Sequence, residues 1–186
     1  MKTQRKQVGI LKTSDKLDLI ILMDHCDNLD LSNKDNLNFW LYCRLSIHSG
    51  LRSIDILEMK VKDIDFEERC VVLVERKTKK KVKITSIPNV VLNNINRSED
   101  FVLWNNKYKT NVSLMTINRR LKEVFKGTNL NISSHSIRKA KARFIYEKTG
   151  NDIIKAMIFL NHSSPTMTKN YLNITQEEKE FLYTIE

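Results

Sequence analysis

The sequence predicts an α+β fold that is mostly α-helical and carries a small three-stranded antiparallel sheet. Apolar residues recur at helical spacing over most of the chain, whereas neighbouring segments between residues 61 and 87 alternate or are rich in β-branched residues. With 186 residues, of which 41% are hydrophobic, the chain can bury one well-formed core. One globular domain is therefore expected.

The N-terminal part is expected to hold two helices behind a basic arm. Residues 1–12 are basic and lack a periodic pattern. Thr13 and Ser14 can cap a first helix, which gives way to a polar loop at 27–36. The second helix, at about 37–47, is apolar nearly all round, so we expect it to be central and buried.

The expected sheet follows a helix break at Ser49-Gly50 and a short helix over 51–57. Residues 61–66 alternate in polarity, and residues 70–74 form a β-branched, apolar run. Residues 81–87 also alternate, after a tight, lysine-rich turn. These segments predict an antiparallel sheet that ends in a cationic hairpin.

The C-terminal half is predicted to be helical, with a polar break near residues 104–111. Apolar periodicity and cap residues place its helices. Their expected starts are residue 89, Leu114, His135, Asp152, Pro165 and Thr175, the last with a capping box to Glu178.

Positive charge is unevenly distributed along the chain. The 32 Lys and Arg exceed the 22 Asp and Glu, which gives a net charge of +10. Residues 17–36 hold five Asp against one Lys, but residues 76–83 hold six cations and no acid. A localised basic surface favours a polyanionic partner, most often nucleic acid, although a merely basic soluble protein stays an alternative.

The three cysteines, Cys26, Cys43 and Cys70, are far apart and odd in number. This pattern predicts neither a disulfide framework nor a zinc site, and favours core residues in a reducing cytoplasm. The N-terminus does not resemble a signal peptide, and no 18-residue apolar segment is found. We therefore expect a cytoplasmic protein that does not bind a membrane.

Residues 134–171 contain a set of groups that no common metal, thiol or Ser-His-Asp site uses. His135 and Arg138 lie one helical turn apart and project from the same side, away from the apolar face, so Arg138 would be awkward in the core. His162 and Tyr171 follow. Reaction at a phosphate would use all four, with cations to neutralise charge and a phenol to attack. Taken alone, the His-x-x-Arg spacing is equally explained by ordinary charged residues at the exposed N-terminus of a helix.

Five segments in a fixed order resemble the tyrosine site-specific recombinases, the phage integrase family. They are Gly50-Leu51-Arg52-Ser53-Ile54-Asp55, Arg76-Lys77-Thr78-Lys79, His135-Ser136-Ile137-Arg138, Leu160-Asn161-His162-Ser163-Ser164 and Thr168-Lys169-Asn170-Tyr171. The resemblance implies that family's catalytic-domain fold over residues 13–186, without the N-terminal core-binding domain that usually precedes it. A short family member and a catalytic fragment both remain open. Asn161 stands where the family commonly has Gly, and Asn tolerates positive φ better than most residues.

The resemblance implies that the protein cleaves and rejoins DNA through a 3′-phosphotyrosine, without metal or cofactor. Because the ordinary pKa of tyrosine is about 10, the nucleophile Tyr171 needs a strongly activated phosphate. Arg52 and Arg138 would each hold phosphate oxygens. The other implied roles are general acid for Lys77, proton acceptor or phosphate ligand for His135, phosphate hydrogen bonding for His162, and orientation of local groups for Asp55.

Further cations are expected to contact the DNA backbone, which positions DNA without reading its sequence. These are Lys79, Lys80, Lys81, Lys83, Arg119, Arg120, Lys139, Lys141 and Arg143. The hairpin lysines among them are also rivals of Lys77 for the acid role. The expected partners are double-stranded DNA, near the nucleoid, and other copies of the chain, which would dock through the C-terminal helix once on DNA. No small-molecule substrate is expected.

Three other functions remain open. A type IB topoisomerase-like enzyme, which relaxes DNA, would use the same groups. A DNA-binding accessory or regulatory protein could keep the fold without the activity. An RNA-binding module is disfavoured because the sequence shows no aromatic-rich sheet motif.

Overall fold

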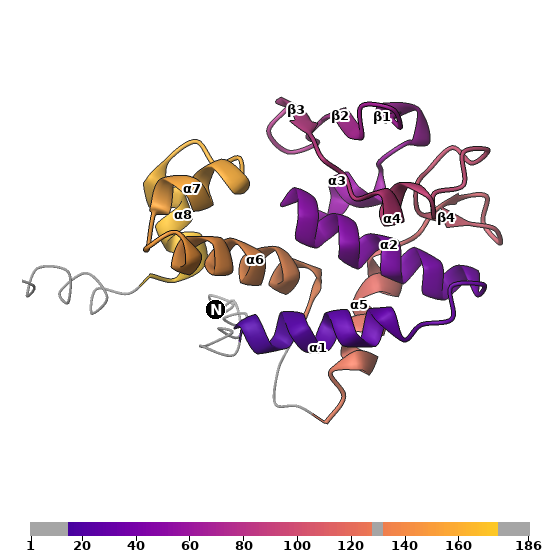
Figure 1. The fold of residues 1–186 in the computed structure, drawn as a ribbon, viewed down its shortest axis with the longest axis horizontal. Coiled ribbons are helices and arrows are strands. Elements are labelled where there is room, and N and C mark those ends of the chain that lie inside the picture. The colour runs from indigo at the N-terminus through magenta and orange to yellow at the C-terminus, as the bar shows by residue number, and fades with distance from the viewer. Residues whose placement is uncertain (1–14, 128–131, 175–186) are drawn as a thin grey trace, which may run out of the picture.

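The computed structural model describes residues 15–127 and 132–174 (Figure 1). Its helices are α1 (Asp15–Asp27), α2 (Lys34–Ser49), α3 (Ser53–Leu57), α4 (Asn89–Leu92), α5 (Leu114–Val124), α6 (Ser134–Lys148), α7 (Ile153–Phe159) and α8 (Pro165–Leu172). Its strands are β1 (Ile64–Asp65), β2 (Cys70–Val74), β3 (Lys81–Ile84), β4 (Trp104–Asn105) and β5 (Thr110–Asn111). The expected N-terminal arm, the caps Thr13 and Ser14, and the last helix from Thr175 lie outside the described residues.

The predicted α+β class is confirmed, with α2 at the centre. Six of its apolar residues are almost fully buried, namely Phe39, Trp40, Leu41, Tyr42, Cys43 and Leu45. The helix begins three residues earlier than expected, because the Asn33 side chain accepts hydrogen bonds from the backbone N–H of Asp35 and Asn36. Gly50 ends it with a left-handed φ of 65°.

Helix α1 lies alongside α6 (Figure 1). Leu22 and Cys26 reach the core, whereas Ile20 and Ile21 stay largely in solvent. As expected, Cys26, Cys43 and Cys70 are buried and unpaired.

The three-stranded sheet has the order β1-β2-β3 and is antiparallel throughout. The predicted strand at residues 70–74 has the observed bounds of β2, and Val71 pairs with both Ile64 and Ile84. The strand predicted over 61–66 shortens to β1, because Val61–Asp63 forms a 3₁₀ turn that begins where the Asp63 carboxylate accepts a hydrogen bond from the Lys60 N–H.

A second, two-stranded sheet, β4-β5, occupies the polar stretch near residues 104–111, where only a helix break was predicted. Trp104 pairs with Asn111 and Asn105 with Thr110. The Asn105 side chain accepts hydrogen bonds from the Lys107 and Tyr108 N–H groups, which closes the turn between the strands. Strands this short carry too little pattern to be predicted.

Buried side chains form two clusters. The larger one contains α2 and its neighbours, including Ile117 on α5 and Ile137 on α6. The smaller one joins α6, α7 and α8 around five buried residues, Ala142, Tyr146, Ala156, Leu160 and Leu172. Arg138 lies on α6 between Ile137 and Ala140 of the larger cluster, and it donates a hydrogen bond to the carbonyl of Leu160 in the smaller one.

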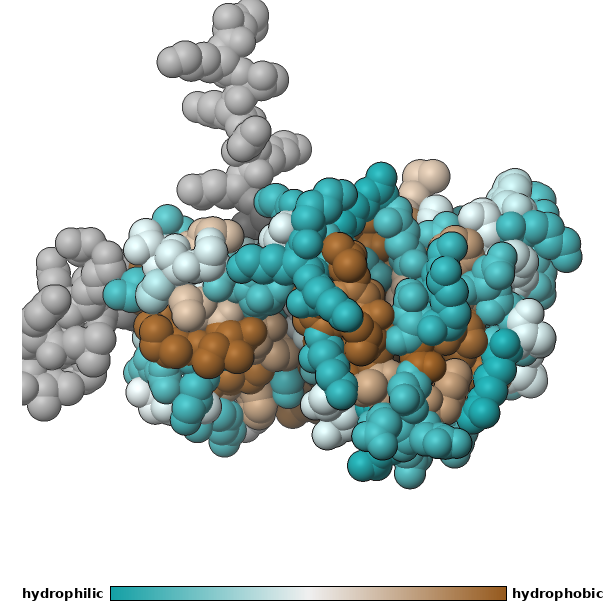
Figure 2. All heavy atoms as spheres, turned by 90° about the horizontal axis from the view of Figure 1, so that it is seen from above, coloured by the Kyte–Doolittle hydropathy of each residue, from teal (hydrophilic) through white to brown (hydrophobic). Residues whose placement is uncertain are grey.

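The face seen from above is mostly hydrophilic, with hydrophobic patches between the polar side chains (Figure 2). Among residues 15–127 and 132–174, no helix is long and apolar enough to span a bilayer. Within the same ranges, no three His, Cys, Asp or Glu side chains are grouped where they could hold a metal ion.

Candidate active site

One cavity of about 570 Å³ brings together side chains from distant parts of the chain. All six residues assigned a catalytic role in the sequence line it, namely Arg52, Lys77, His135, Arg138, His162 and Tyr171. They come from the start of α3, the β2-β3 turn, α6, the α7-α8 loop and α8. The cavity therefore lies where the two halves of the chain meet.

Arg138 is buried, with 4% of its surface exposed, contrary to the expectation that it would avoid the core. Its Nε donates to the Gly50 carbonyl at 2.5 Å and its Nη2 to the Leu160 carbonyl at 2.7 Å. These bonds compensate for the loss of water around the guanidinium. Burial lowers the pKa of Arg138, but an arginine stays charged at neutral pH. A fixed cation therefore reaches the cavity.

Arg52 is held by Glu75, a residue that the sequence analysis did not single out. Arg52 Nη1 donates to Glu75 Oε1 at 2.7 Å, and the Glu75 side chain is only 1% exposed. A signal was present, since Glu75 is the single acid at the boundary between an apolar strand and the basic run that begins at Arg76.

Lys77 lies in the turn between β2 and β3, and Asp55 fixes that turn from α3. Asp55 Oδ1 accepts a hydrogen bond from the Arg76 N–H at 2.8 Å, next to Lys77 in the chain. Burial raises the pKa of Asp55, and the nearby Glu75 carboxylate raises it further. Asp55 thus contacts the lysine turn from outside the cavity.

Both histidines of the cavity favour the neutral form. The pKa of His135 is lowered by loss of water and then by the charges of Arg138, Arg52 and Lys77. The pKa of His162 is lowered to about 4, again first by burial and then by the two arginines. His162 Nδ1 lies 3.1 Å from Thr168 Oγ1, so one ring nitrogen is engaged by α8.

Tyr171 packs between a cation and an imidazole. The Arg138 guanidinium carbon is 5.6 Å from the centre of the Tyr171 ring, and the His162 ring meets it edge-on at 5.4 Å. The Tyr171 hydroxyl is buried beside the Arg138 guanidinium but makes no hydrogen bond of good geometry with any described residue. Burial raises the pKa of Tyr171, although the Arg138 charge opposes the rise. The phenol is therefore protonated at neutral pH.

We expect His162 to titrate at a pKa of about 4 in the folded protein and near 6.5 when the chain is unfolded in urea. Between these pH values the unfolded chain binds the extra proton, so the free energy of unfolding should fall as pH drops from 6.5 towards 4. NMR of the histidine ring carbons measures both titrations. A folded-state midpoint at or above 6.5 would contradict the burial described here.

The expected DNA-backbone cations fall into two groups. The hairpin lysines Lys79, Lys80, Lys81 and Lys83 are exposed. By contrast, Arg120 donates to Asn36 on α2, and Arg143 donates to the Leu172 carbonyl and to Glu147. The structure thus favours a structural role for these two arginines over a phosphate contact.

The remaining cations of that set differ in their contacts. Arg119 Nε lies 4.0 Å from Glu123 Oε1 on the exposed face of α5. The Nζ of Lys141 lies over the Phe144 ring. Lys139 is half-buried on α6. Apolar residues that the sequence did not indicate, Leu114 and Met167, also line the cavity.

Comparison of this sequence with known proteins identifies a matching family and related proteins. The model of the phage integrase family matches residues 15–178. A probable integrase/recombinase of Bacillus subtilis (strain 168), YoeC, is 29% identical over 161 residues, which cover 83% of this chain and 87% of that protein.

Solved structures share the fold at low sequence identity. The XerH site-specific recombinase in a pre-cleavage complex with its difH substrate superposes with a TM-score of 0.71 at 17% identity, over 99% of this chain and 56% of that one. A lambda integrase tetramer bound to a Holliday junction gives a TM-score of 0.62 at 17% identity, over 90% of this chain and 49% of that one. This chain thus spans about half of each of these solved proteins.

Proposed function

Because this chain belongs to the phage integrase family, we propose that it is a site-specific recombinase that cleaves and rejoins DNA strands through a 3′-phosphotyrosine. One observation carries the proposal. Arg52 and Arg138, 86 residues apart in the sequence, converge with Tyr171 on one cavity. Two fixed guanidiniums beside a phenol suit in-line attack on a phosphodiester, because catalysis at phosphorus depends chiefly on positioning and charge neutralisation.

In the proposed step, Tyr171 Oη forms a bond to the DNA phosphorus while the bond from phosphorus to the 5′-oxygen breaks. The phenol proton passes to His135, which is neutral at pH 7 and can accept it. Lys77 gives a proton to the departing 5′-oxygen. The reverse reaction, in which a 5′-hydroxyl attacks the phosphotyrosine, rejoins the strand.

The arginines would hold the two non-bridging phosphate oxygens. The Gly50 and Leu160 carbonyls engage Nε and Nη2 of Arg138, and the Nη1 donors of Arg138 would face the phosphate. The Thr168 hydroxyl lies 3.1 Å from Nδ1 of His162 and 3.4 Å from the Ser164 carbonyl, and its one proton can go to either. When it donates to Nδ1, the imidazole proton sits on Nε2. That tautomer can donate a hydrogen bond to a phosphate oxygen.

The partners proposed are double-stranded DNA and further copies of this chain, which would assemble on DNA through the C-terminal helix. The tetrameric, junction-bound lambda integrase with the same fold supports assembly in principle. The exposed hairpin lysines support backbone contact. A cytoplasmic location, with the DNA, follows from the proposed substrate.

A trapping experiment tests this function. The protein is incubated with nicked duplexes that carry the ends of its own genetic element, so that the short cleaved fragment diffuses away and the covalent adduct accumulates. We expect an adduct that resists denaturing electrophoresis and disappears with protease. Relaxation of a supercoiled plasmid that lacks any such site would favour the topoisomerase-like alternative, and DNA binding without adduct on every substrate would favour the accessory protein.

A further inference from the structure

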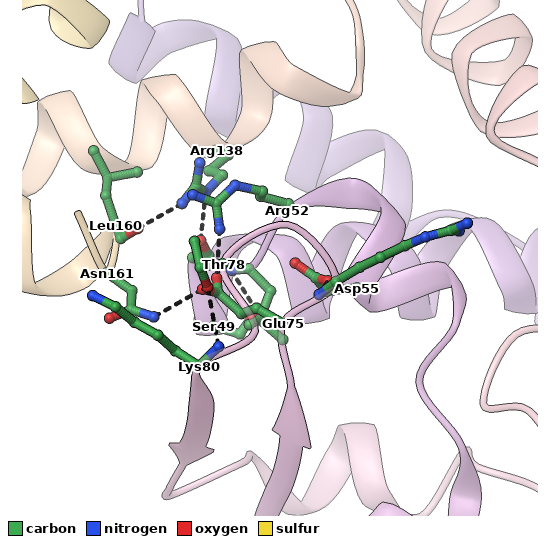
Figure 3. A network of polar contacts seen from close by, with 12 residues as sticks. Ser49, Arg52, Asp55, Glu75, Thr78, Lys80, Arg138, Leu160 and Asn161 are labelled. Carbon is green, nitrogen blue, oxygen red and sulfur yellow. Dashed lines mark hydrogen bonds and ion pairs between the residues drawn. The ribbon is translucent and has the colours of Figure 1, made fainter. Parts of the chain in front are cut away.

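The buried carboxylate of Glu75 lies where three segments of the site meet (Figure 3). Its Oε1 accepts a hydrogen bond from Arg52 Nη1 at 2.7 Å. Its Oε2 accepts from Thr78 Oγ1 at 2.5 Å and from Asn161 Nδ2 at 2.9 Å. These three donors come from the start of α3, the β2-β3 turn and the α7-α8 loop. One side chain therefore links all three segments.

The backbone of Glu75 also closes the turn that carries Lys77. The Glu75 N–H donates to the Lys80 carbonyl and the Lys79 N–H donates to the Glu75 carbonyl, both at 2.9 Å. Lys77 itself is exposed between these two contacts. A lysine side chain on an exposed turn has many rotamers, so its position depends on how firmly the turn is held.

Asn161 connects this turn to His162, its neighbour in the chain. Its backbone is left-handed, with φ of 49°, a conformation that Asn adopts more readily than most residues other than Gly. Gly would satisfy the backbone equally well, but only Asn supplies an amide to Glu75. The Asn161 side chain thus adds a contact that the local conformation does not require.

We propose that Glu75 and Asn161 form a positioning pair that sets Lys77 and His162 at a fixed separation across the cavity. The inference rests on the proposed function, because it concerns the proton that Lys77 gives to the leaving oxygen. General-acid catalysis depends steeply on geometry, and an error of about 1 Å can cost about 100-fold in rate. The alternative is that Glu75 merely stabilises the fold through its ion pair with Arg52.

Two substitutions break the pair. Asn161→Gly removes this contact alone, whereas Glu75→Gln also removes the charge that pairs with Arg52 and the acceptor of the Thr78 hydroxyl. In Glu75→Gln the side chain keeps its shape and an acceptor for Arg52, but its amide cannot accept from Asn161. In Asn161→Gly the left-handed backbone is retained and only the side-chain amide is lost. Circular dichroism and urea unfolding show whether each variant is folded before any rate is compared.

The chain offers a matched control for each substitution. Glu99→Gln removes a partly buried carboxylate that pairs with Lys34 at 2.9 Å, and neither residue lines the cavity. Asn151→Gly replaces an exposed Asn that has a similar left-handed φ of 63°, outside the cavity. Neither control should change the rate of cleavage.

Two substrates separate positioning of the acid from general stabilisation. One is the nicked duplex with its natural 5′-oxygen leaving group. The other carries sulfur in place of that bridging 5′-oxygen, so the phosphorus–sulfur bond breaks and a thiolate departs. A thiol has a pKa of about 8.5 and leaves without protonation, whereas an alcohol needs a general acid. Lys77→Ala gives the reference pattern, slow on oxygen and restored on sulfur.

We expect Glu75→Gln and Asn161→Gly to cleave the oxygen substrate about 10-fold more slowly than the wild type, as for loss of a hydrogen bond to a charged group. On the sulfur substrate both should come within about threefold of the wild type. The double variant should be no slower than Glu75→Gln alone, because that substitution already removes the contact with Asn161.

Equal losses on both substrates would overturn the proposal, since they would mean that Glu75 acts through the fold or through Arg52. Additive losses in the double variant would overturn it as well. A wild-type protein that forms no adduct on either substrate would instead refute the proposed recombinase function.

Discussion

Tyr171→Phe should abolish the covalent adduct with DNA while leaving the fold intact. The substitution removes one oxygen, the proposed nucleophile, and leaves the ring between Arg138 and His162. We expect the rate of adduct formation to fall by at least about 10³-fold, below detection, because no other group would supply the attacking oxygen. Single-turnover assays on nicked DNA measure this loss.

Although Tyr171→Phe should abolish activity, we expect it to leave the stability of the fold unchanged or to raise it. The Tyr171 hydroxyl is buried and makes no hydrogen bond of good geometry with a described residue, although the Arg138 guanidinium lies close to it, so its removal should cost little. The free energy of unfolding should stay within about 1 kcal/mol of the wild type, or rise. DNA affinity, measured by fluorescence anisotropy, should be retained. An adduct that survives in Tyr171→Phe would refute the nucleophile assignment.

Gly50→Ala should disrupt both the fold and the site. A Cβ added at Gly50 would lie 2.6 Å from the Phe159 carbonyl oxygen and 2.8 Å from the Phe159 ring, and the backbone there has a φ of 65°. The clash and the left-handed backbone together should lower the free energy of unfolding by about 3 kcal/mol. Because the Gly50 carbonyl holds Arg138 Nε, adduct formation should fall with it.

Gly150→Ala is the matched control, since Gly150 has a similar φ of 71° with no atom near its missing Cβ. It should cost only about 1 kcal/mol, from backbone strain alone. Urea denaturation of the three proteins separates the two effects. Equal destabilisation by the two substitutions would show that the approach of Phe159 does not matter.

Much of the fold was predictable from the residue types within each helix and strand and from their capping residues. Strand β2 is an unbroken apolar run rich in valine, and α8 begins where Ser164 caps a helix with a proline in its first turn. The class of fold followed from such elements. The polar segment that forms β4 and β5 was missed, because two-residue strands are set by tertiary context rather than by propensity.

The residues that line the candidate site were predicted from the sequence, but the groups that hold them in place were not. Arg52, Lys77 and Arg138 were named from the sequence, and the structure places them around one cavity. The burial of Arg138 was not foreseen, because its compensation comes from the carbonyls of Gly50 and Leu160, which are distant in the sequence. Glu75 was missed for the same reason, since two of its three partners, Arg52 and Asn161, lie 23 and 86 residues away.

The division of the buried side chains into two clusters has a consequence for local unfolding. Tyr171 packs against the small cluster of α6, α7 and α8, and His162 lies in the loop between α7 and α8. Arg52 follows Leu51 of the large cluster, and Lys77 lies in the turn after β2, whose Val71 belongs to that cluster. Opening of the small cluster exposes less apolar surface than global unfolding and therefore needs less free energy. Amide hydrogens of α7 and α8 should exchange with solvent faster than those of α2. Local unfolding would then displace Tyr171 from the cavity first, while the part of the chain that carries Arg52 and Lys77 stays folded.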